Sequence, residues 1–441
     1  MLNKQAQFVI EQLNNNGFEC FVVGGAIRDY LLGLPIHDYD FTTNATPSQI
    51  KEVFSHFTLL NKGEKHGTIG VLIDDKVYEI TTYRIDGDYL LNRKPEKVDF
   101  SSNLSEDLAR RDFTINSVCY CPKKGFIDVY NGINDIENKI IKTVGDPVLR
   151  FNEDALRILR ALRFSSILGF EIEEETANAI FKTKGLLQNV SKERIYSELC
   201  KILIGKNASK VLEKFKYVLF EIIPELEKSD NFEQISKSHT KNVFEHTLWV
   251  IDNCENNLVL RLAALFHDSG KPYSYQDGSD GYRHYKDHWD KSAEIAKTAL
   301  TRLRAPKNVI KQVELLCKHH DADLVNKVEI KELLNVFGID LFNLLLKHKL
   351  ADVLAHSQYG IDKYLPYLQN TEKLYDEIIK NGECYKISQL NFNGSDALNL
   401  GLDGQVIGEI LLKLYKLVIN EKIENNFECL KDYVIRNFVK N

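Results

Sequence analysis

At 441 residues the chain is longer than one hydrophobic core usually supports, so we expect two to four domains. Its 44% hydrophobic and 27% charged residues are ordinary for a globular protein, and its formal net charge of -6 neither indicates nor excludes nucleic-acid binding. The sequence has no apolar run of the roughly 18 residues that span a bilayer and no N-terminal signal segment, which predicts a cytoplasmic protein with no membrane contact. Its eight cysteines lack zinc-type spacing, so we expect them to remain free thiols.

A turn near the N-terminus is the first informative stretch. Residues 4–15 predict a short amphipathic helix, and an apolar run from Phe21 then ends in Gly24 and Gly25, with Arg28 shortly after. This order predicts a strand, a tight turn and a helix start, where free backbone N–H groups favour a phosphate.

Two acidic residues, Asp38 and Asp40, follow this turn. On a strand, a spacing of two directs both carboxylates to the same face. Two such carboxylates suit Mg²⁺ that also touches substrate phosphates. A Gly-Gly turn or an Asp-x-Asp pair alone is commonly structural, but in this order they resemble the signature of the nucleotidyltransferase superfamily. The branch they resemble contains the tRNA nucleotidyltransferases (CCA-adding enzymes) and the bacterial poly(A) polymerases.

A hairpin is predicted next. Thr46 is the expected N-cap of a helix that runs through Phe54, and residues 67–74 and 76–84 predict two strands joined at Asp74 and Asp75. Glu79 lies on the second strand, where a plain solvent-facing role is the structural alternative. The resemblance implies that Glu79 is a third catalytic carboxylate beside the aspartates.

Residues 84–100 are polar, contain one Gly and one Pro, and follow no clean period, which predicts a mobile loop. A bare surface loop is one interpretation. In the resembled family this place holds a flexible element that accompanies the step from C to A addition.

A second motif of the resembled family is Leu108-Ala-Arg110-Arg111-Asp112-Phe-Thr-Ile-Asn116-Ser. Arg111 can hold a triphosphate through several fixed donors, and Asp112 can accept a hydrogen bond from a ribose 2′-hydroxyl. The structural alternative is a capping or salt-bridge cluster at a helix start. The resemblance assigns nucleotide binding to Gly25, Arg28, Arg111, Asp112 and Asn116.

One continuous helix is predicted over residues 150–164, with Leu156, Leu159 and Leu162 on its packed side. Charged residues recur at every third position on another face, namely Asp154, Arg157, Arg160 and Arg163. A solvated charged face is the structural alternative.

Selection between nucleotide bases would explain chemically why an aspartate and an arginine are spaced in this way. Cytosine and adenine both present an amino donor beside a ring-nitrogen acceptor, whereas uracil and guanine present a carbonyl and an N–H there. A carboxylate only accepts and a guanidinium only donates, so Asp154 and Arg157 together complement cytosine and adenine. The Glu-Asp-x-x-Arg motif resembles the nucleotide-selecting motif of the CCA-adding family, with Arg160 and Arg163 as further nucleotide contacts.

A histidine-rich constellation lies further along the chain. His267 and Asp268 close an apolar helical run, with His246 upstream and Asp352 downstream. Scattered histidines are usually core or surface residues, but this arrangement resembles an HD phosphohydrolase domain. The resemblance implies a divalent cation held by these four residues, with His288 and His319 in reach of a second metal or a phosphate. An HD scaffold that only docks RNA remains an alternative.

The predicted fold class is an α/β (α+β) nucleotidyltransferase head with a mixed β-sheet, followed by an all-helical neck, HD-type body and tail. The expected domains are a head (1–140), a neck that selects nucleotides and binds RNA (141–225), an HD-type domain (226–370) and a tRNA-binding tail (371–441).

The predicted reaction is attack of a tRNA 3′-hydroxyl on the α-phosphate of CTP or ATP, with Mg²⁺ at Asp38 and Asp40. The expected partners are tRNA, ATP and CTP, without an obligate protein partner. The alternatives are an enzyme that adds only A, a poly(A) polymerase, or an HD phosphohydrolase whose head binds nucleotides.

Overall fold

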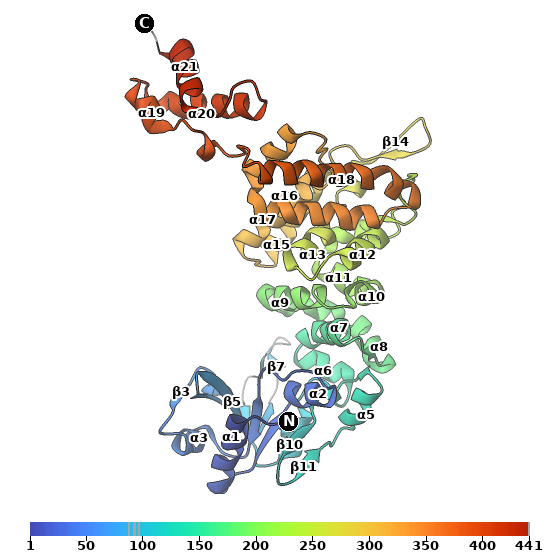
Figure 1. The fold of residues 1–441 in the computed structure, drawn as a ribbon. Coiled ribbons are helices and arrows are strands. Elements are labelled where there is room, and N and C mark those ends of the chain that lie inside the picture. The colour runs from blue at the N-terminus through green and yellow to red at the C-terminus, as the bar shows by residue number, and fades with distance from the viewer. Residues whose placement is uncertain (87–88, 91–93, 96–97, 440–441) are drawn as a thin grey trace. The chain divides into compact units, whose positions relative to one another are not determined.

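The structure is a computed structural model that describes residues 1–86, 89–90, 94–95 and 98–439. The chain divides into two compact units, Met1–Pro224 and Glu225–Asn441. Figure 1 shows the strands of the large sheet in the first unit and a predominantly helical second unit.

A seven-stranded sheet forms the centre of the first unit, in the order β11-β10-β1-β2-β5-β4-β3. Its strands are β1 (Cys20–Val23), β2 (Asp40–Thr43), β3 (Thr58–Leu60), β4 (Thr68–Ile73), β5 (Lys76–Thr82), β10 (Cys119–Cys121) and β11 (Gly125–Ile127). Strands β2 and β5 are parallel and the other neighbours are antiparallel, which confirms the predicted mixed sheet.

Five helices and two 3₁₀ turns accompany this sheet. They are α1 (Lys4–Asn15), α2 (Gly25–Leu31), α3 (Pro47–Val53), η1 (Glu64–His66), α4 (Leu104–Ala109), η2 (Thr114–Asn116) and α5 (Gly132–Glu137). Thr46 caps α3 through a capping box with Gln49, as predicted from Thr46-Pro47. Apolar side chains of α1, α2, α3 and the sheet share one buried core, which includes Ile10, Phe21, Phe41 and Phe54.

The loop predicted over residues 84–100 is wrong where the structure describes it. Four short strands lie there, with β6 (Arg84–Asp86) antiparallel to β9 (Val98–Phe100) and β7 (Tyr89–Leu90) antiparallel to β8 (Lys94–Pro95). Within the described residues, β6 pairs only with β9 and β7 only with β8, and each strand has just two or three residues, too few for a clean period. Residues 87–88, 91–93 and 96–97 lie outside the described part.

Helices continue the first unit beyond the sheet. They are α6 (Pro147–Glu153), α7 (Leu156–Leu168), α8 (Glu174–Thr183), η3 (Lys184–Asn189), α9 (Lys192–Leu203), α10 (Ala208–Lys214) and α11 (Lys216–Ile222), with a short parallel pair of β12 (Ile140–Ile141) and β13 (Glu171–Ile172). The single helix predicted over 150–164 is wrong. The chain breaks at Asp154, whose backbone is extended (φ -135°, ψ 102°) and whose carboxylate accepts from the Leu156 N–H at 3.1 Å. An acidic cap at this place ends one helix and starts the next.

The second unit packs helices around its own core, apart from one short hairpin of β14 (Gln276–Asp277) and β15 (Arg283–His284). Its helical elements are η4 (Pro224–Ser229, shared with the first unit at Pro224), α12 (Val243–Asn253), α13 (Leu258–Phe266), α14 (Lys271–Ser274), α15 (His288–Arg302), α16 (Lys307–His319), α17 (Lys327–Leu354) and α18 (Gln358–Lys380). Helix α17 is kinked at Gly338, where φ is 70° and ψ is 170°.

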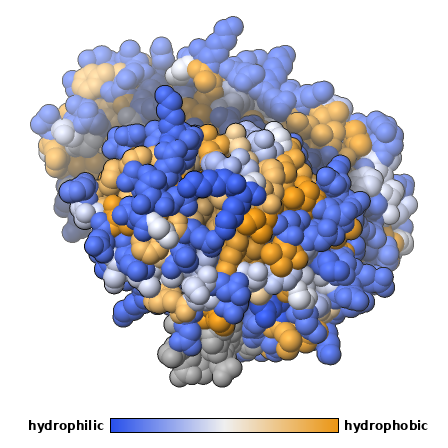
Figure 2. Space-filling model, turned by 90° about the horizontal axis from the view of Figure 1, so that it is seen from below, coloured by the Kyte–Doolittle hydropathy of each residue, from blue (hydrophilic) through white to orange (hydrophobic). Residues whose placement is uncertain are grey.

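The C-terminal segment has η5 (Ile387–Gln389), α19 (Gly394–Asn399), α20 (Gly404–Ile419) and α21 (Phe427–Phe438). A separate hydrophobic cluster that includes Phe392, Leu414 and Leu430 holds these helices together. No helix in the described part of the chain is long and apolar enough to cross a membrane. Hydrophilic residues cover much of the face in Figure 2, with hydrophobic residues in patches between them. All eight cysteines are free, as predicted.

Candidate functional site

The glycine turn lies between β1 and α2, as predicted. Gly24 has φ 79° and ψ -135°, a conformation that favours glycine, and a Cβ there would lie 3.6 Å from Arg111 Nη1. Arg28 on α2 donates to Asn116 Oδ1 at 2.9 Å and to Asp29 Oδ1 at 2.7 Å. Three of the predicted nucleotide contacts, Arg28, Arg111 and Asn116, therefore lie around this turn although they are far apart in the sequence.

The three predicted carboxylates gather at neighbouring strands. Asp40 on β2 is in register with Glu79 on the parallel strand β5, so their side chains point to the same face of the sheet. Asp38, Asp40 and Glu79 are all exposed. Partial desolvation and the negative charges of Glu79 and Asp38 raise the pKa of Asp40, against the opposing effect of Arg111. Oxygen ligands that repel one another in this way fit a hard divalent cation.

Arg110, Arg111 and Asp112 follow the last residue of α4, so they lie at a helix end and not at the helix start of the structural alternative. Both arginines pair with buried Asp107, at 2.6 Å from Arg110 and 3.3 Å from Arg111. The Asp107 carboxylate also accepts from Thr42 in β2 at 2.9 Å. Sequence reasoning missed this central carboxylate, because Asp107 follows Glu106 in the first turn of α4, where acidic residues are common and do not indicate burial.

Asp112 is held by two partners from different elements. It accepts from Asn116 Nδ2 at 3.1 Å and from Arg160 Nε at 2.7 Å. Burial raises the pKa of Asp112, but the Arg160 charge and the Asn116 hydrogen bond outweigh burial and lower it to about 2. The carboxylate is therefore ionised near neutral pH and joins η2 to α7.

Asp154 and Arg157 have intramolecular partners in this structure. Arg157 is nearly buried, donates to Glu153 Oε2 at 2.7 Å and donates to the Arg110 carbonyl at 2.7 Å. Asp154 accepts from Arg194 Nη2 on α9 at 2.7 Å. Sequence reasoning missed Arg194, since a partner on another helix leaves no trace in local spacing.

Three arginines surround the Phe164 ring on α7. The guanidinium carbons of Arg28, Arg160 and Arg163 lie 5.1, 5.5 and 4.3 Å from its centroid. Arg163 also donates to Glu198 at 3.1 Å. Cation–π contacts thus hold three positive charges, from α2 and α7, around one aromatic ring. The sequence analysis did not predict Phe164 as a site residue.

The second unit brings together the four predicted HD residues. His246 comes from α12, His267 and Asp268 follow α13, and Asp352 lies on α17. His246 Nε2 lies 2.8 Å from Asp352 Oδ1, and His267 Nε2 lies 3.3 Å from Asp268 Oδ2. His267 is fully buried, yet its Nε2 has no hydrogen-bond partner among the described residues. Lys271 places its ammonium 2.6 Å from Asp268 Oδ2.

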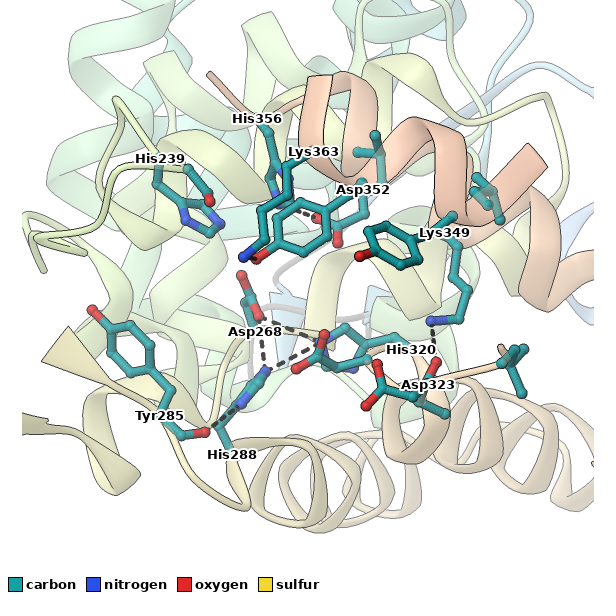
Figure 3. Close-up of a pocket in the computed structure, with 18 of the residues that line it drawn as sticks. His239, Asp268, Tyr285, His288, His320, Asp323, Lys349, Asp352, His356 and Lys363 are labelled. Atoms are coloured by element: carbon teal, nitrogen blue, oxygen red, sulfur yellow. Dashed lines mark hydrogen bonds and ion pairs between the residues drawn. The ribbon is translucent and has the colours of Figure 1, made fainter. Parts of the chain in front are cut away.

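The predicted contact of His319 with this cluster is wrong. His319 is half-buried against Phe337, whereas the next residue, His320, points to Asp268 together with His288. Sequence reasoning had no means to choose between adjacent histidines at a helix end. Asp268, His288, His320 and Asp352 line a cavity of about 770 Å³, seen in Figure 3.

The two units match known families in chain order. The family model described as "Poly A polymerase head domain" matches residues 20–142, and "Probable RNA and SrmB- binding site of polymerase A" matches residues 169–229. The model "HD domain" matches residues 236–356. Fold and site thus define a nucleotidyltransferase-type head joined to an HD domain.

The curated relatives of this chain are CCA-adding enzymes, a more specific group within this class of protein. The chain is 46% identical to a CCA-adding enzyme of Ligilactobacillus salivarius, over 48% of this chain and 52% of that protein. It is 44% identical to a CCA-adding enzyme of Staphylococcus aureus, over 52% of this chain and 57% of that protein. The chain therefore spans about half the length of the curated relatives it matches. Its head is thus similar to that of poly(A) polymerases, and about half of the chain is similar to CCA-adding enzymes.

Solved structures extend the likeness along almost the whole chain. The Bacillus stearothermophilus CCA-adding enzyme in complex with CTP is 25% identical, with a TM-score of 0.72 over 98% of this chain and 96% of that chain. The Thermotoga maritima CCA-adding enzyme complexed with tRNA shares the fold at 21% identity, with a TM-score of 0.63 over 99% and 96%.

Proposed function

We propose that this protein adds the CCA 3′ terminus to tRNA by successive transfer of CMP from CTP and AMP from ATP, with release of pyrophosphate. The observation that carries the proposal is the register of Asp40 with Glu79, beside Arg111 and the glycine turn. The assignment of CTP and tRNA as substrates is supported by the similarity to CCA-adding enzymes and to solved structures that contain CTP or tRNA. A cytoplasmic location, the finer domain boundaries given above and the absence of an obligate protein partner remain predictions.

Different residues of the head would hold the metal ion and the triphosphate. Asp38 and Asp40 would hold Mg²⁺, with Glu79 beside them; the cation would activate the tRNA 3′-hydroxyl and stabilise the leaving pyrophosphate. Arg28 and Arg111 would bind the triphosphate through their guanidinium groups, and the buried Nε of Arg111 has no hydrogen-bond partner among the described residues.

Asp112 would accept from the ribose 2′-hydroxyl, with Asn116 and Arg160 fixing its orientation through the hydrogen bonds that the structure shows. Asp154 and Arg157 would select the base, with Arg163 supporting the nucleotide side of α7. Because Asp154 and Arg157 have internal partners here, nucleotide binding would have to exchange the Glu153 and Arg194 contacts for contacts with the base.

Three tRNA transcripts test the reaction, ending before CCA, after CC and after CCA, each with labelled CTP and ATP. We expect CCA to be completed on the first two and no extension of the third. Extension of all three by A alone would identify a poly(A) polymerase, and extension of only the CC-ended transcript would identify an A-adding enzyme.

The head site is tested by Asp40→Asn and Asp38→Asn. Both variants should lose transfer in Mg²⁺ and keep tRNA binding, because the carboxylates serve chemistry rather than docking. Asp75→Asn is the matched control, since Asp75 is an exposed carboxylate in the β4–β5 turn and tolerates the same change. Wild-type turnover of the Asp40→Asn variant would overturn the assignment.

We further propose one divalent cation in the second unit, held by His246, His267, Asp268 and Asp352. The support is the donor set of His246, His267 and Asp352, whose ligand atoms lie close enough together for one metal ion. The buried His267 Nε2 has no hydrogen-bond partner among the described residues and lies 3.3 Å from Asp268 Oδ2. This site would serve hydrolysis of a phosphoester. His246→Ala should lower the number of bound cations by one without changing nucleotide transfer.

A further inference from the structure

Asp107 is a fully buried carboxylate of the head that is not among the residues proposed to touch the substrates. Its two oxygens have different partners. Oδ1 accepts from Arg110 Nε at 2.9 Å and from Arg110 Nη2 at 2.6 Å. Oδ2 accepts from Arg111 Nη2 at 3.3 Å and from Thr42 Oγ1 at 2.9 Å. One carboxylate therefore joins the end of α4 to strand β2.

The Asp107 carboxylate is ionised in this environment. Burial raises its pKa, but the charges of Arg110 and Arg111 and the hydrogen bonds from Arg110 and Thr42 outweigh burial and lower it. One carboxylate beside two guanidinium groups leaves the cluster with a net positive charge. Arg110 makes the shorter contacts, so the longer contact orients Arg111 and leaves most of its charge for a phosphate.

The Thr42 contact places this cluster next to the proposed metal carboxylates. Thr42 lies two residues after Asp40 on β2, so the two side chains point to the same face of the strand. Partial desolvation raises the pKa of Asp40 and the Arg111 charge opposes that rise, so the two groups lie near each other. A Cβ on Gly24 would lie 3.6 Å from Arg111 Nη1. The Arg111 guanidinium is therefore held by Asp107 between the glycine turn and Asp40.

We propose that Asp107 is a positioning residue for nucleotide transfer, which fixes the Arg111 guanidinium where it binds the phosphates of CTP or ATP. This inference deepens the proposed function and rests on its assignment of the triphosphate to Arg111. A guanidinium that already has a fixed partner loses less side-chain entropy when it binds a phosphate. Displacing such a group by about 1 Å can reduce its effect roughly a hundredfold. The Thr42 hydrogen bond ties Asp107 to the strand that carries Asp40.

Neighbouring carboxylates on α4 supply a matched pair of variants. Asp107→Asn keeps the size of the side chain and one acceptor oxygen, but its amide N–H groups would face guanidinium donors. Glu106→Gln makes the same change at the preceding residue, whose carboxylate accepts from Ser101. Each full-length protein is dialysed to equilibrium against labelled CTP in Mg²⁺ without tRNA, so that no transfer takes place. Circular dichroism verifies that each variant is folded.

We expect Asp107→Asn to weaken CTP binding roughly tenfold to a hundredfold, and Glu106→Gln to bind CTP as the wild type does. Pyrophosphate has neither base nor ribose, so its competition with labelled CTP measures the phosphate contacts alone and should weaken by a similar factor. Equal CTP affinity of Asp107→Asn and the wild type would overturn the proposal. Weaker CTP binding with unchanged competition by pyrophosphate would overturn it as well, because Asp107 would then not act on the phosphates.

A double variant tests whether Asp107 acts through Arg111. In an Arg111→Ala background, Asp107→Asn should weaken pyrophosphate binding no further, because no guanidinium remains to be positioned. Effects that multiply in the double variant would overturn the proposal. Should Asp107→Asn fail to fold, Thr42→Val replaces it and Thr42→Ser, which keeps the hydroxyl, is its control. CTP affinity should then fall for Thr42→Val alone, and equal affinity of the two variants would contradict the proposed link.

Transfer to a tRNA that ends before CCA is measured separately, which distinguishes this proposal from the proposed function. Asp107→Asn should raise KM for CTP and leave KM for tRNA unchanged, whereas a merely weakened fold would lower kcat without changing either KM. A wild-type protein that binds CTP but transfers nothing would overturn the proposed function, while the dialysis results still decide on Asp107. A wild-type protein that binds no CTP would overturn both.

Discussion

Two carboxylates of the first unit have pKa values displaced in opposite directions. Neighbouring negative charge and partial desolvation raise the pKa of Asp40, whereas Arg160 and Asn116 outweigh burial and lower that of Asp112. The raised pKa of Asp40 indicates a site that a bound cation would stabilise. The lowered pKa of Asp112 indicates a carboxylate whose charge is already compensated within the protein. We therefore expect Asp112 to affect folding as well as nucleotide binding.

The Asp112 contact predicts an acid-dependent loss of stability. The folded pKa of about 2 lies below the ordinary value of about 4, so the stabilisation is fully present above pH 4 and is lost as the pH falls toward 2. Asp112→Asn should lower the free energy of unfolding near neutral pH by about 2 kcal/mol and flatten its decline between pH 4 and pH 2. Urea unfolding followed by circular dichroism measures both, and parallel pH curves for variant and wild type would contradict this origin.

Base selection by Asp154 and Arg157 is tested with all four ribonucleotides. Leaving one partner facing an unmatched base edge costs about 1–3 kcal/mol of discrimination, or roughly tenfold to over a hundredfold. Arg157→Ala should raise misincorporation of UTP and GTP relative to CTP, and Asp154→Ala should weaken selection of C and A alike. The measurement is kcat/KM for each nucleotide on tRNA lacking CCA.

Arg194→Ala is the control for this experiment, because it frees Asp154 from its internal partner without changing a proposed base contact. Asp154 and Arg157 would be structural residues if their variants lost rate equally for all four nucleotides. A structural role is a specific alternative for Arg157, because this residue already donates to Glu153 and to the Arg110 carbonyl.

At the scale of single elements, the break between α6 and α7 changes what the charged residues do. Asp154 lies at the junction and caps α7, so it belongs to a hinge-like turn rather than to a continuous charged face. The spacing of three from Asp154 to Arg163 runs across the junction unchanged, which is why periodicity alone predicted one helix. The strands that carry Asp40 and Glu79 were predictable because strand alternation is a local property, whereas the position of Glu79 beside Asp40 was expected only from the family resemblance.

Contacts between distant elements were not predictable in the same way. Arg194 reaches Asp154 from α9, and the choice of His320 over His319 depends on how the end of α16 is rotated. Neither property leaves a pattern in the neighbouring sequence. The short strands within 84–100 escaped prediction for another reason, since strands of two or three residues are too short to show an alternating period.

The kink of α17 gives a prediction about backbone conformation. Gly338 has φ 70° and ψ 170°, and a Cβ would meet nothing within 4 Å, so Gly338→Ala would introduce backbone strain without a clash. We expect a loss of about 1–3 kcal/mol and a lower Tm. Gly408→Ala is the matched control, because Gly408 is exposed inside α20 and alanine should stabilise that helix by about 0.5–1 kcal/mol. Equal Tm values for the two variants would contradict the strained kink.

At the scale of the whole molecule, the two units carry sites of different ligand chemistry. The head offers carboxylate oxygens at Asp38 and Asp40, whereas the second unit offers imidazole nitrogens around Asp268. Oxygen ligands suit Mg²⁺ and imidazoles suit transition cations, so the two sites should be separable by metal as well as by mutation.

The separation is tested by replacing His267 and Asp268 together with alanine. Because both residues lie in the second unit, nucleotide transfer to tRNA should remain mostly unchanged while metal-dependent hydrolysis of 2′,3′-cyclic phosphates disappears. In the wild type, chelation followed by Mg²⁺ should restore transfer alone, and Co²⁺ should be needed for hydrolysis. Equal loss of both activities in a folded double variant, or recovery of both by Mg²⁺, would show that one cation chemistry serves the whole chain.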